Sequence, residues 1–137
     1  MPFSEAIDCL ILDHFTGKAT WTAPAAIYMG LSSTTPTKTG TNVTEPTAGN
    51  YARVLITAAQ FSSAATSATA INAEKAVAAA SADWVSGADL THIVFYTAIT
   101  SGTFLGFRAL ADPKPVMNGD TAKFAATTGI TITMGGT

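Results

Sequence analysis

The side chains that could perform chemistry are few in this sequence and widely separated. His14 and His92 lie far apart in the chain, and neither has another histidine or a cysteine pair at metal-ligand spacing. A zinc site needs several converging ligands of this kind, so the sequence predicts none. Cys9 is the only cysteine, which excludes a disulfide framework, and its position on a helix predicts a packed thiol. No serine lies in a nucleophile elbow, and no glycine-rich loop joins a strand to a helix for phosphate binding.

Two carboxylates and three tyrosines remain as candidates for a carbohydrate site. Asp112 and Asp120 flank turns, where an aspartate ordinarily hydrogen-bonds its own backbone. As a glycosidase pair they would require a sugar cleft, and the sequence gives no sign of one. Tyr28, Tyr51 and Tyr96 could line a carbohydrate surface, although a core or interface role is favoured. We therefore expect no enzyme, no cofactor and no metal.

The composition indicates a surface made for assembly. The 137 residues are enough for one domain with a real core. Charged residues make up 12%, about half the usual share, and 23 threonines and 26 alanines take their place. A neutral, hydroxyl-rich exterior suits a protein that is buried in an assembly or exposed on a particle. The alternative is an ordinary β domain with a biased composition.

The charge pattern excludes several other classes of protein. The net charge is −2 and the seven Lys and Arg are scattered singly, which argues against nucleic-acid binding. The first residues carry Glu5, Asp8 and Asp13 with no preceding Lys or Arg, so we expect no signal peptide. No apolar run approaches the roughly 20 residues of a membrane span. The chain is expected to be made in a cytosol.

The N-terminal segment, residues 2–15, is predicted to be a helix. Ser4 is a suitable N-cap and Gly17 a natural stop. Such a helix either packs on the sheet or docks on a partner. Its apolar stripe is the candidate interface and consists of Phe3, Ile7, Leu10, Ile11 and Phe15.

The densest strand-forming run lies in the second half of the chain. His92–Tyr96 is an unbroken β-branched and aromatic block, which predicts a central strand with both faces covered. Phe104–Leu110 is predicted to return beside it, and Asp112–Pro115 to end that strand because proline lacks a backbone donor. Asn118-Gly119 then predicts a short hairpin. Gly129–Met134 alternates strictly, which predicts a half-buried strand.

Two further strands and a long loop precede this region. Ala26–Leu31 and Gly49–Ile56 are predicted strands, and Ser32–Asn50 is predicted to be a loop that is functional or held by a neighbour. Arg53 points away from the apolar side of its strand and could pair with Glu45. An exposed pair of this kind would contribute little.

The alanine-rich segment Phe61–Ala82 is ambiguous. Ten of its 22 residues are alanine, which favours helix by propensity, but it has no apolar stripe at helical spacing. We predict a loop followed by a strand near Lys75–Ala80.

Together these elements predict a mainly β, single-domain antiparallel β-sandwich of immunoglobulin-like or jelly-roll type with a short N-terminal helix. The domain is residues 1–137, with the helix in 1–17 and the sandwich in 18–137. The candidate core anchors are Trp84, Phe95, Phe107 and Phe124.

Several segments together resemble a family of small phage virion proteins, often labelled tail-fibre-like. The most specific parts are the Tyr51-Ala52-Arg53-Val54 element and the Gly119-Asp120 turn, and neither is catalytic. Val94 and Thr97 depart from the family pattern. Further parts of the resemblance are the N-terminal helix, Ala25–Ser32, Thr44-Glu45-Pro46, Trp84 with Thr91–Phe95, Leu110, Pro113, Val116, Phe124 and Ile130–Thr133.

The resemblance implies a structural protein of a phage particle. The leading hypothesis is a capsid decoration or cement protein that bridges capsid subunits through many weak, largely apolar contacts. The alternative is a tail-fibre or receptor-binding module whose exposed aromatics and Ser32–Asn50 loop contact a cell-surface glycan. A third hypothesis is a small hydrolase, which a screen on polysaccharides would test.

The partners that the resemblance implies are the major capsid protein or other virion proteins. A homo-oligomer, trimer or dimer, is expected, with no nucleic acid and no membrane. The expected location is the virion, after assembly in the host cytoplasm.

Overall fold

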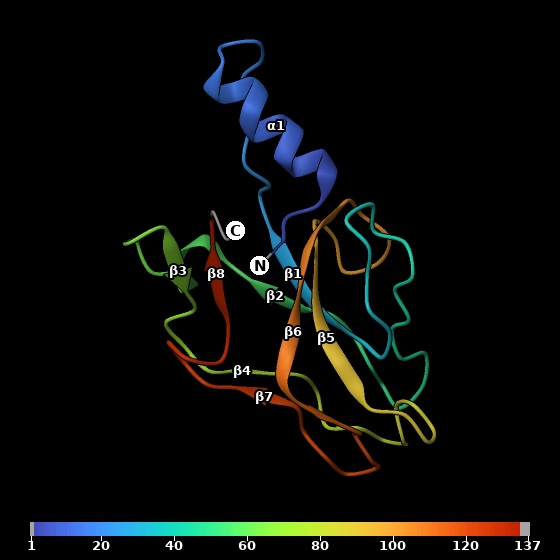
Figure 1. Ribbon diagram of the computed structural model, residues 1–137. Coiled ribbons are helices and arrows are strands. Elements are labelled where there is room, and N and C mark those ends of the chain that lie inside the picture. The colour runs from blue at the N-terminus through green and yellow to red at the C-terminus, as the bar shows by residue number, and fades with distance from the viewer. Residues whose placement is uncertain (1, 135–137) are drawn as a thin grey trace.

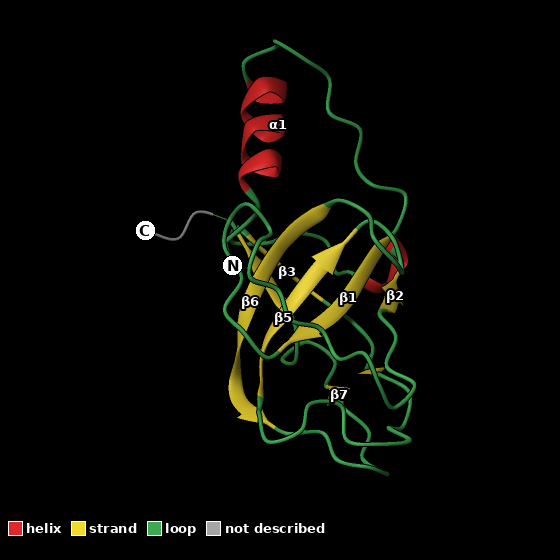
Figure 2. Ribbon diagram, turned by 90° about the vertical axis from the view of Figure 1, so that its right-hand side faces the viewer, coloured by secondary structure: helices red, strands yellow, loops and turns green. Residues whose placement is uncertain are grey.

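A computed structural model describes residues 2–134 and confirms a mainly β protein with one N-terminal helix (Figures 1 and 2). Its main sheet is antiparallel, in the order β2-β1-β5-β6, and two short antiparallel ribbons, β3-β8 and β4-β7, form a second layer beside it. The main sheet consists of β2 (Val54–Ile56), β1 (Ile27–Ser32), β5 (Leu90–Tyr96) and β6 (Phe104–Lys114). The other elements are α1 (Glu5–Phe15), the 3₁₀ turn η1 (Ala58–Gln60), β3 (Ala68–Ala70), β4 (Lys75–Ala76), β7 (Lys123–Phe124) and β8 (Thr131–Thr133).

The core lies between the main sheet and the ribbons. Met29 of β1 and Phe95 of β5 supply its sheet side, and both are at most 1% exposed. Ile71 and Ile130, which flank the β3-β8 ribbon, supply the other side and are fully buried. The segments that meet here are distant in sequence, so burial of their apolar side chains holds the two layers together.

The central strand β5 is covered on both faces, as its apolar sequence predicts. Phe95 points into the core, while Val94 is fully buried on the opposite side. Val94 lies there close to Gly30 of β1, which in turn lies against Glu45 of the long loop. The loop therefore covers the second face of the sheet.

The structure separates the four predicted core anchors into two pairs. Trp84 and Phe95 are buried, at 4% and 1% exposure, and the Trp84 indole N–H donates to the Gly49 carbonyl at 2.9 Å. Phe124 is half-buried and packs against the edge of the core. Phe107 is also half-buried and stacks on Phe104, with ring centroids 6.3 Å apart.

The strand β6 continues past its predicted end. It extends to Lys114, and Leu90 of β5 pairs with Lys114 beyond a register irregularity. The strand therefore ends within the predicted segment Asp112–Pro115, but later than Leu110, the last strand residue that the sequence predicted. The reason is the position of β6 at the outside of the sheet, where Pro113 can occupy a strand without removing a ladder bond from an inner neighbour.

The Asn118-Gly119 turn forms, but it does not make the predicted hairpin. The Asp120 N–H donates to the Met117 carbonyl at 3.0 Å, which closes a turn. The strand that follows, β7, pairs with β4 instead of returning along β6. Local turn chemistry was predicted correctly, whereas the partner strand comes from a distant part of the chain.

The alanine-rich segment contains strand and loop, as predicted. All of Phe61–Ala82 is described, and none of it is helical. Only Lys75–Ala76 of the predicted strand pairs, while Val77 and Ala80 beyond it are buried at 2% and 3% exposure. The earlier strand at Gly49–Ile56 is likewise shorter, because only Val54–Ile56 pairs with β1.

Candidate functional site

The helix α1 forms an arm that projects from the β body (Figures 1 and 2). Its start is fixed locally, since the Ser4 side chain accepts a hydrogen bond from the Ile7 N–H at 3.3 Å. Glu5 and Asp8 occupy the first turn, where the helix dipole favours negative charge. The helix ends at Phe15, and Gly17 follows with a φ of 73°. Across residues 2–134 no helix is long and apolar enough to cross a membrane.

Among the described residues, the backbone hydrogen bonds that join the arm to the body lie at the start of the helix. The Ser4 N–H donates to the Leu105 carbonyl at 2.9 Å, and the Glu5 N–H donates to the Lys38 carbonyl at 3.0 Å. An exposed ion pair, Asp8 with Lys38 at 2.7 Å, lies just beyond them. The far end is held by the return segment, where the Trp21 N–H donates to Nδ1 of His14 at 3.3 Å. The helix is therefore anchored at its N-terminal turn and open along much of its length.

The predicted apolar stripe is divided between the core and the solvent. Ile7 is 5% exposed and belongs to the core, and Phe3 and Ile11 are half-buried against it. Leu10 is 38% exposed and Phe15 is 86% exposed. Both alternatives left open by the sequence thus apply, because Ile7 and Ile11 pack on the body while Leu10 and Phe15 are exposed.

Sequence reasoning did not identify two parts of this surface. Leu12 is 59% exposed, but it lies off the stripe and carried no periodic signal. An apolar pocket of about 250 Å³ opens where α1 leaves the body. Segments from six parts of the chain form it, so no local pattern could reveal it. Its walls are Phe3, Ile7, Trp21, Ala23–Ile27, Ile56, Ala58, Phe61, Phe95, Leu105 and Ile132.

On the opposite face of the sheet, Arg53 is the centre of a buried polar cluster. Its Nε and Nη2 donate to the two carboxylate oxygens of Glu45 at 3.0 and 2.5 Å. Its Nη1 donates to the carbonyls of Ala98 and Ser101 at 3.0 and 2.7 Å, and the guanidinium lies 3.5 Å above the Tyr96 ring centroid. The side chains of Arg53 and Glu45 are only 9% and 19% exposed. The expectation of an exposed, weak pair was wrong, because the long loop covers it.

Tyr51 completes this Glu45–Arg53 cluster. Its hydroxyl donates to Glu45 at 2.6 Å and accepts from the Leu31 N–H at 2.8 Å. Burial, and then the hydrogen bond to Glu45, raise the pKa of Tyr51, and burial also raises the pKa of Tyr96. A Cβ at Gly30 would lie 2.5 Å from Glu45, so the close approach requires glycine. Tyr51 therefore holds the loop on the sheet, and the Tyr96 ring packs against the Arg53 guanidinium, so both tyrosines have a role within the fold.

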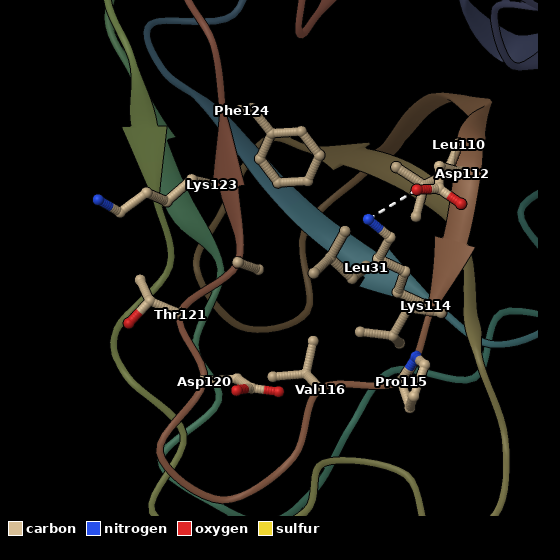
Figure 3. A pocket seen from close by; sticks show the side chains of 12 residues that line it. Leu31, Leu110, Asp112, Lys114, Pro115, Val116, Asp120, Thr121, Lys123 and Phe124 are labelled. Carbon is tan, nitrogen blue, oxygen red and sulfur yellow. Dashed lines mark ion pairs between the residues drawn. The ribbon is translucent and has the colours of Figure 1, made fainter.

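Asp112 and Asp120 do line one groove, of about 500 Å³, between the end of β6 and β7 (Figure 3). Asp112 pairs with Lys114 at 2.6 Å, and Asp120 accepts a hydrogen bond from the Met117 N–H at 3.0 Å. Figure 3 shows the two carboxylates on opposite sides of the groove, with the Phe124 ring above. The cleft that the sequence could not reveal is present, yet each carboxylate is occupied by a neighbour in sequence.

The remaining candidate residues do not converge. In the described part of the chain, no three His, Cys, Asp or Glu side chains are grouped as a metal site. His14 accepts from Trp21, and His92 lies 2.8 Å from the Thr91 hydroxyl. Cys9 is exposed on α1, so the expectation of a packed thiol was wrong. The helix turns that side of its surface to solvent, because only the foot of α1 meets the body.

Comparison with known proteins gives one family. The family model described as podophage GP4 fiber I protein gp80 matches residues 2–133. A comparison with curated proteins gives no match to this sequence.

Proposed function

Because this chain belongs to the podophage GP4 fiber I protein gp80 family, a family of phage virion structural proteins, we propose that it is a component of a phage tail fibre. The single observation that carries this proposal is the match over residues 2–133, which includes the arm and the β body. In the virion, the β body supplies a rigid unit and α1 supplies the contact that holds the unit in the assembly.

The arm supports this division of roles. Phe15 and Leu12 are large apolar side chains that the chain itself leaves exposed, at 86% and 59%. Apolar surface of this kind gains free energy when another protein covers it. The body carries its own core and its own buried ion pair, Arg53 with Glu45, so it can remain folded while the arm binds.

The family description favours the fibre over the head. Decoration of the capsid was the leading hypothesis from the sequence, and the tail fibre was the alternative. A fibre protein joins neighbouring virion proteins at the tail, whereas a decoration protein covers the shell. Decoration remains a prediction that the following experiments test directly.

Location on the particle is the decisive measurement. An epitope inserted between Asn118 and Gly119 would lie in an exposed turn remote from α1, where a side chain at Gly119 meets no neighbour. Gold-labelled antibody against this epitope should mark the tail of intact particles. Labelling spread over the head would refute the fibre proposal and support decoration.

A binding assay gives an independent answer. The purified chain should not co-sediment with tailless heads at roughly 0.1 or 1 M salt, between which the Debye length falls from about 10 to 3 Å. It should co-sediment with tails that lack this protein at both salt concentrations, because apolar contacts persist when charges are screened. Binding to tailless heads, or loss of tail binding at the higher salt, would contradict the proposed location or its apolar mechanism.

The proposed role is structural and not catalytic. The support is that Asp112 and Asp120, the carboxylates of the groove, are each engaged by a local partner. Incubation with a panel of polysaccharides should release no new reducing ends. Activity that disappears in both Asp112→Asn and Asp120→Asn would show that the groove is a hydrolase site.

A further inference from the structure

We propose that the groove between the end of β6 and β7 binds a neutral saccharide, with the C–H face of a sugar ring against its apolar floor and the sugar hydroxyls hydrogen-bonded to its charged rim. Such binding is an activity of the β body that is additional to the structural role proposed above. It does not depend on where the chain lies in the particle. Three features of the groove support it: the floor, the hydrogen-bonding groups of the rim, and the balance of their charges.

The floor of the groove is apolar and belongs to the core. It consists of Leu31, Leu90 and Val116, which are 1%, 2% and 9% exposed. The Phe124 ring lies above them on the β7 side, and Leu110 lies on the β6 side (Figure 3). The volume of about 500 Å³ lies within the range of about 300–1,000 Å³ that is usual for ligand sites. A sugar ring has an apolar C–H face, and covering that face with such side chains gains free energy.

The rim of the groove carries hydrogen-bonding groups that can still bind a ligand. The Asp112 side chain is 72% exposed, and its ion pair with Lys114 is made through Oδ2. Asp120 likewise accepts the Met117 N–H through Oδ2. A carboxylate has two oxygens, so Oδ1 of each aspartate can accept a hydrogen bond from a ligand. Thr121 is exposed and adds a hydroxyl that both donates and accepts.

This combination of floor and rim favours a neutral ligand with many hydroxyl groups. Each sugar hydroxyl donates and accepts, so a saccharide can replace the water on the rim with new hydrogen bonds. An apolar ligand would remove that water from charged groups without replacing it, which costs free energy. Two Asp and two Lys line the groove, so their charges cancel. A neutral saccharide is therefore favoured over a polyanion or a polycation.

The β6 side of the groove is poorly suited to an extended peptide, the other common occupant of a groove beside a strand. A peptide strand binds by pairing its backbone with the exposed edge of a sheet. Pro113 and Pro115 lie at this edge and have no N–H to donate. A bound peptide would lack a backbone donor at both positions, whereas a saccharide does not require one.

The position of the groove keeps it accessible when the arm is bound. Figures 1 and 2 show that the end of β6 and β7 lie at the end of the body remote from α1. In a fibre that holds the chain through α1, the groove would therefore face away from the point of attachment. This orientation rests on the proposed function, and the binding itself does not.

Titration of the ¹⁵N-labelled full chain with neutral trisaccharides tests the groove by nuclear magnetic resonance. The probes are maltotriose, cellotriose, mannotriose and triacetylchitotriose, each added to about 20 mM, because an open groove of this kind should bind with a roughly millimolar Kd. At least one probe should shift the amide signals of Thr121, Lys123 and Phe124 in a saturable manner. The affinity should be the same at roughly 0.1 and 1 M salt, since salt does not screen a neutral ligand.

Two conservative substitutions test the rim. Asp112→Asn removes the charge of one acceptor, and Thr121→Val removes one hydroxyl with little change in shape. Each should weaken binding at least about threefold, as expected for one hydrogen bond, and the double variant about tenfold. Asp13→Asn is the matched control, because Asp13 is an exposed aspartate on α1 and its replacement should leave the affinity unchanged. All three positions are exposed, so circular dichroism should show every variant folded.

Two further probes distinguish the classes of ligand. They are trigalacturonic acid and an acetylated, amidated pentapeptide of alternating threonine and valine, and both should bind more weakly than the best neutral trisaccharide. Tighter binding of either one would overturn the assignment of a neutral saccharide. The site itself would be refuted by an absence of shifts at the groove with all four trisaccharides, or by an affinity that both rim variants leave unchanged. Particle labelling is measured separately, so a chain that binds no saccharide but is found on tails would refute this site while leaving the fibre proposal intact.

Discussion

Replacement of Arg53 by alanine tests whether the long loop is held on the sheet by a buried ion pair. The guanidinium makes three hydrogen bonds to Glu45, one each to the carbonyls of Ala98 and Ser101, and a cation–π contact with Tyr96. All of these are lost in Arg53→Ala. The carboxylate of Glu45 would then remain in a site where its side chain is only 19% exposed.

The expected loss of stability follows from the burial of this pair. Removing one partner of a buried pair costs about 3–5 kcal/mol, because the other charge stays desolvated. The lost cation–π contact contributes about 0.5–2 kcal/mol of such an effect. Glu45 retains the Tyr51 hydrogen bond at 2.6 Å and some access to water, which limits the loss. We expect about 3–5 kcal/mol in total, or a Tm lower by about 10–20 °C for a domain of this size.

Urea denaturation of Arg53→Ala should show this loss, and Lys114→Ala provides the matched control. Lys114 also pairs with a carboxylate, Asp112, but both side chains are at least 70% exposed, so its removal should leave the midpoint unchanged. A free energy of unfolding for Arg53→Ala within about 1 kcal/mol of the wild-type value would refute the reasoning. It would mean that water reaches the pair and that the loop is held by other contacts.

Three further predictions concern single positions in the body. Trp84→Ala should lower the free energy of unfolding, measured in urea, by about 3–5 kcal/mol, because Trp84 lies in the core at 4% exposure. A loss below about 1 kcal/mol would mean that Trp84 lies outside the core. The raised pKa values of Tyr51 and Tyr96 mean that the folded state keeps protons that the unfolded state loses near pH 10. Stability should therefore be complete below about pH 10 and fall above it, and Tyr51→Phe should weaken that fall in alkaline melts. Gly49→Ala should lower the free energy of unfolding by about 2–4 kcal/mol, because the φ of Gly49 is 67° and a Cβ there would lie 2.5 Å from the Ala82 carbonyl. Gly119→Ala is the control: at φ 90° with no close neighbour, it should lower the same free energy by only about 1 kcal/mol.

The parts of the fold that local chemistry determines could be predicted from the sequence. The Ser4 cap and Gly17 delimit α1, and the unbroken apolar run of His92–Tyr96 identifies the central strand. The end of β6 could not be predicted in this way. Whether Pro113 breaks a strand depends on whether that strand has a neighbour on its second side, and that is a property of the assembled sheet.

The candidate site, like the fold, could be predicted only in part from the sequence. The stripe from Phe3 to Phe15 is visible in the sequence, but the point at which the helix leaves the body decides which members are buried. The burial of Arg53 and Glu45 depends on a loop folding across the sheet from a distance. The local feature of the sequence that is connected with this burial is Gly30, where the absence of a side chain makes room for the Glu45 carboxylate.

This protein has few charged side chains, and most of its Lys and Arg residues interact with other groups of the same chain. Within residues 2–134, six of the seven Lys and Arg side chains interact with other groups of the chain, which leaves few charges to attract a partner. Arg108 donates to the Thr131 carbonyl, and Lys75 donates to the Leu55 carbonyl and the Gln60 side chain, while Lys38, Arg53, Lys114 and Lys123 pair with carboxylates. Exposed pairs contribute little to binding in any case, since salt screens them. The apolar side chains that project on α1 are then the surface with the most free energy to gain from a partner, so assembly should depend on the arm far more than on the charge of the body.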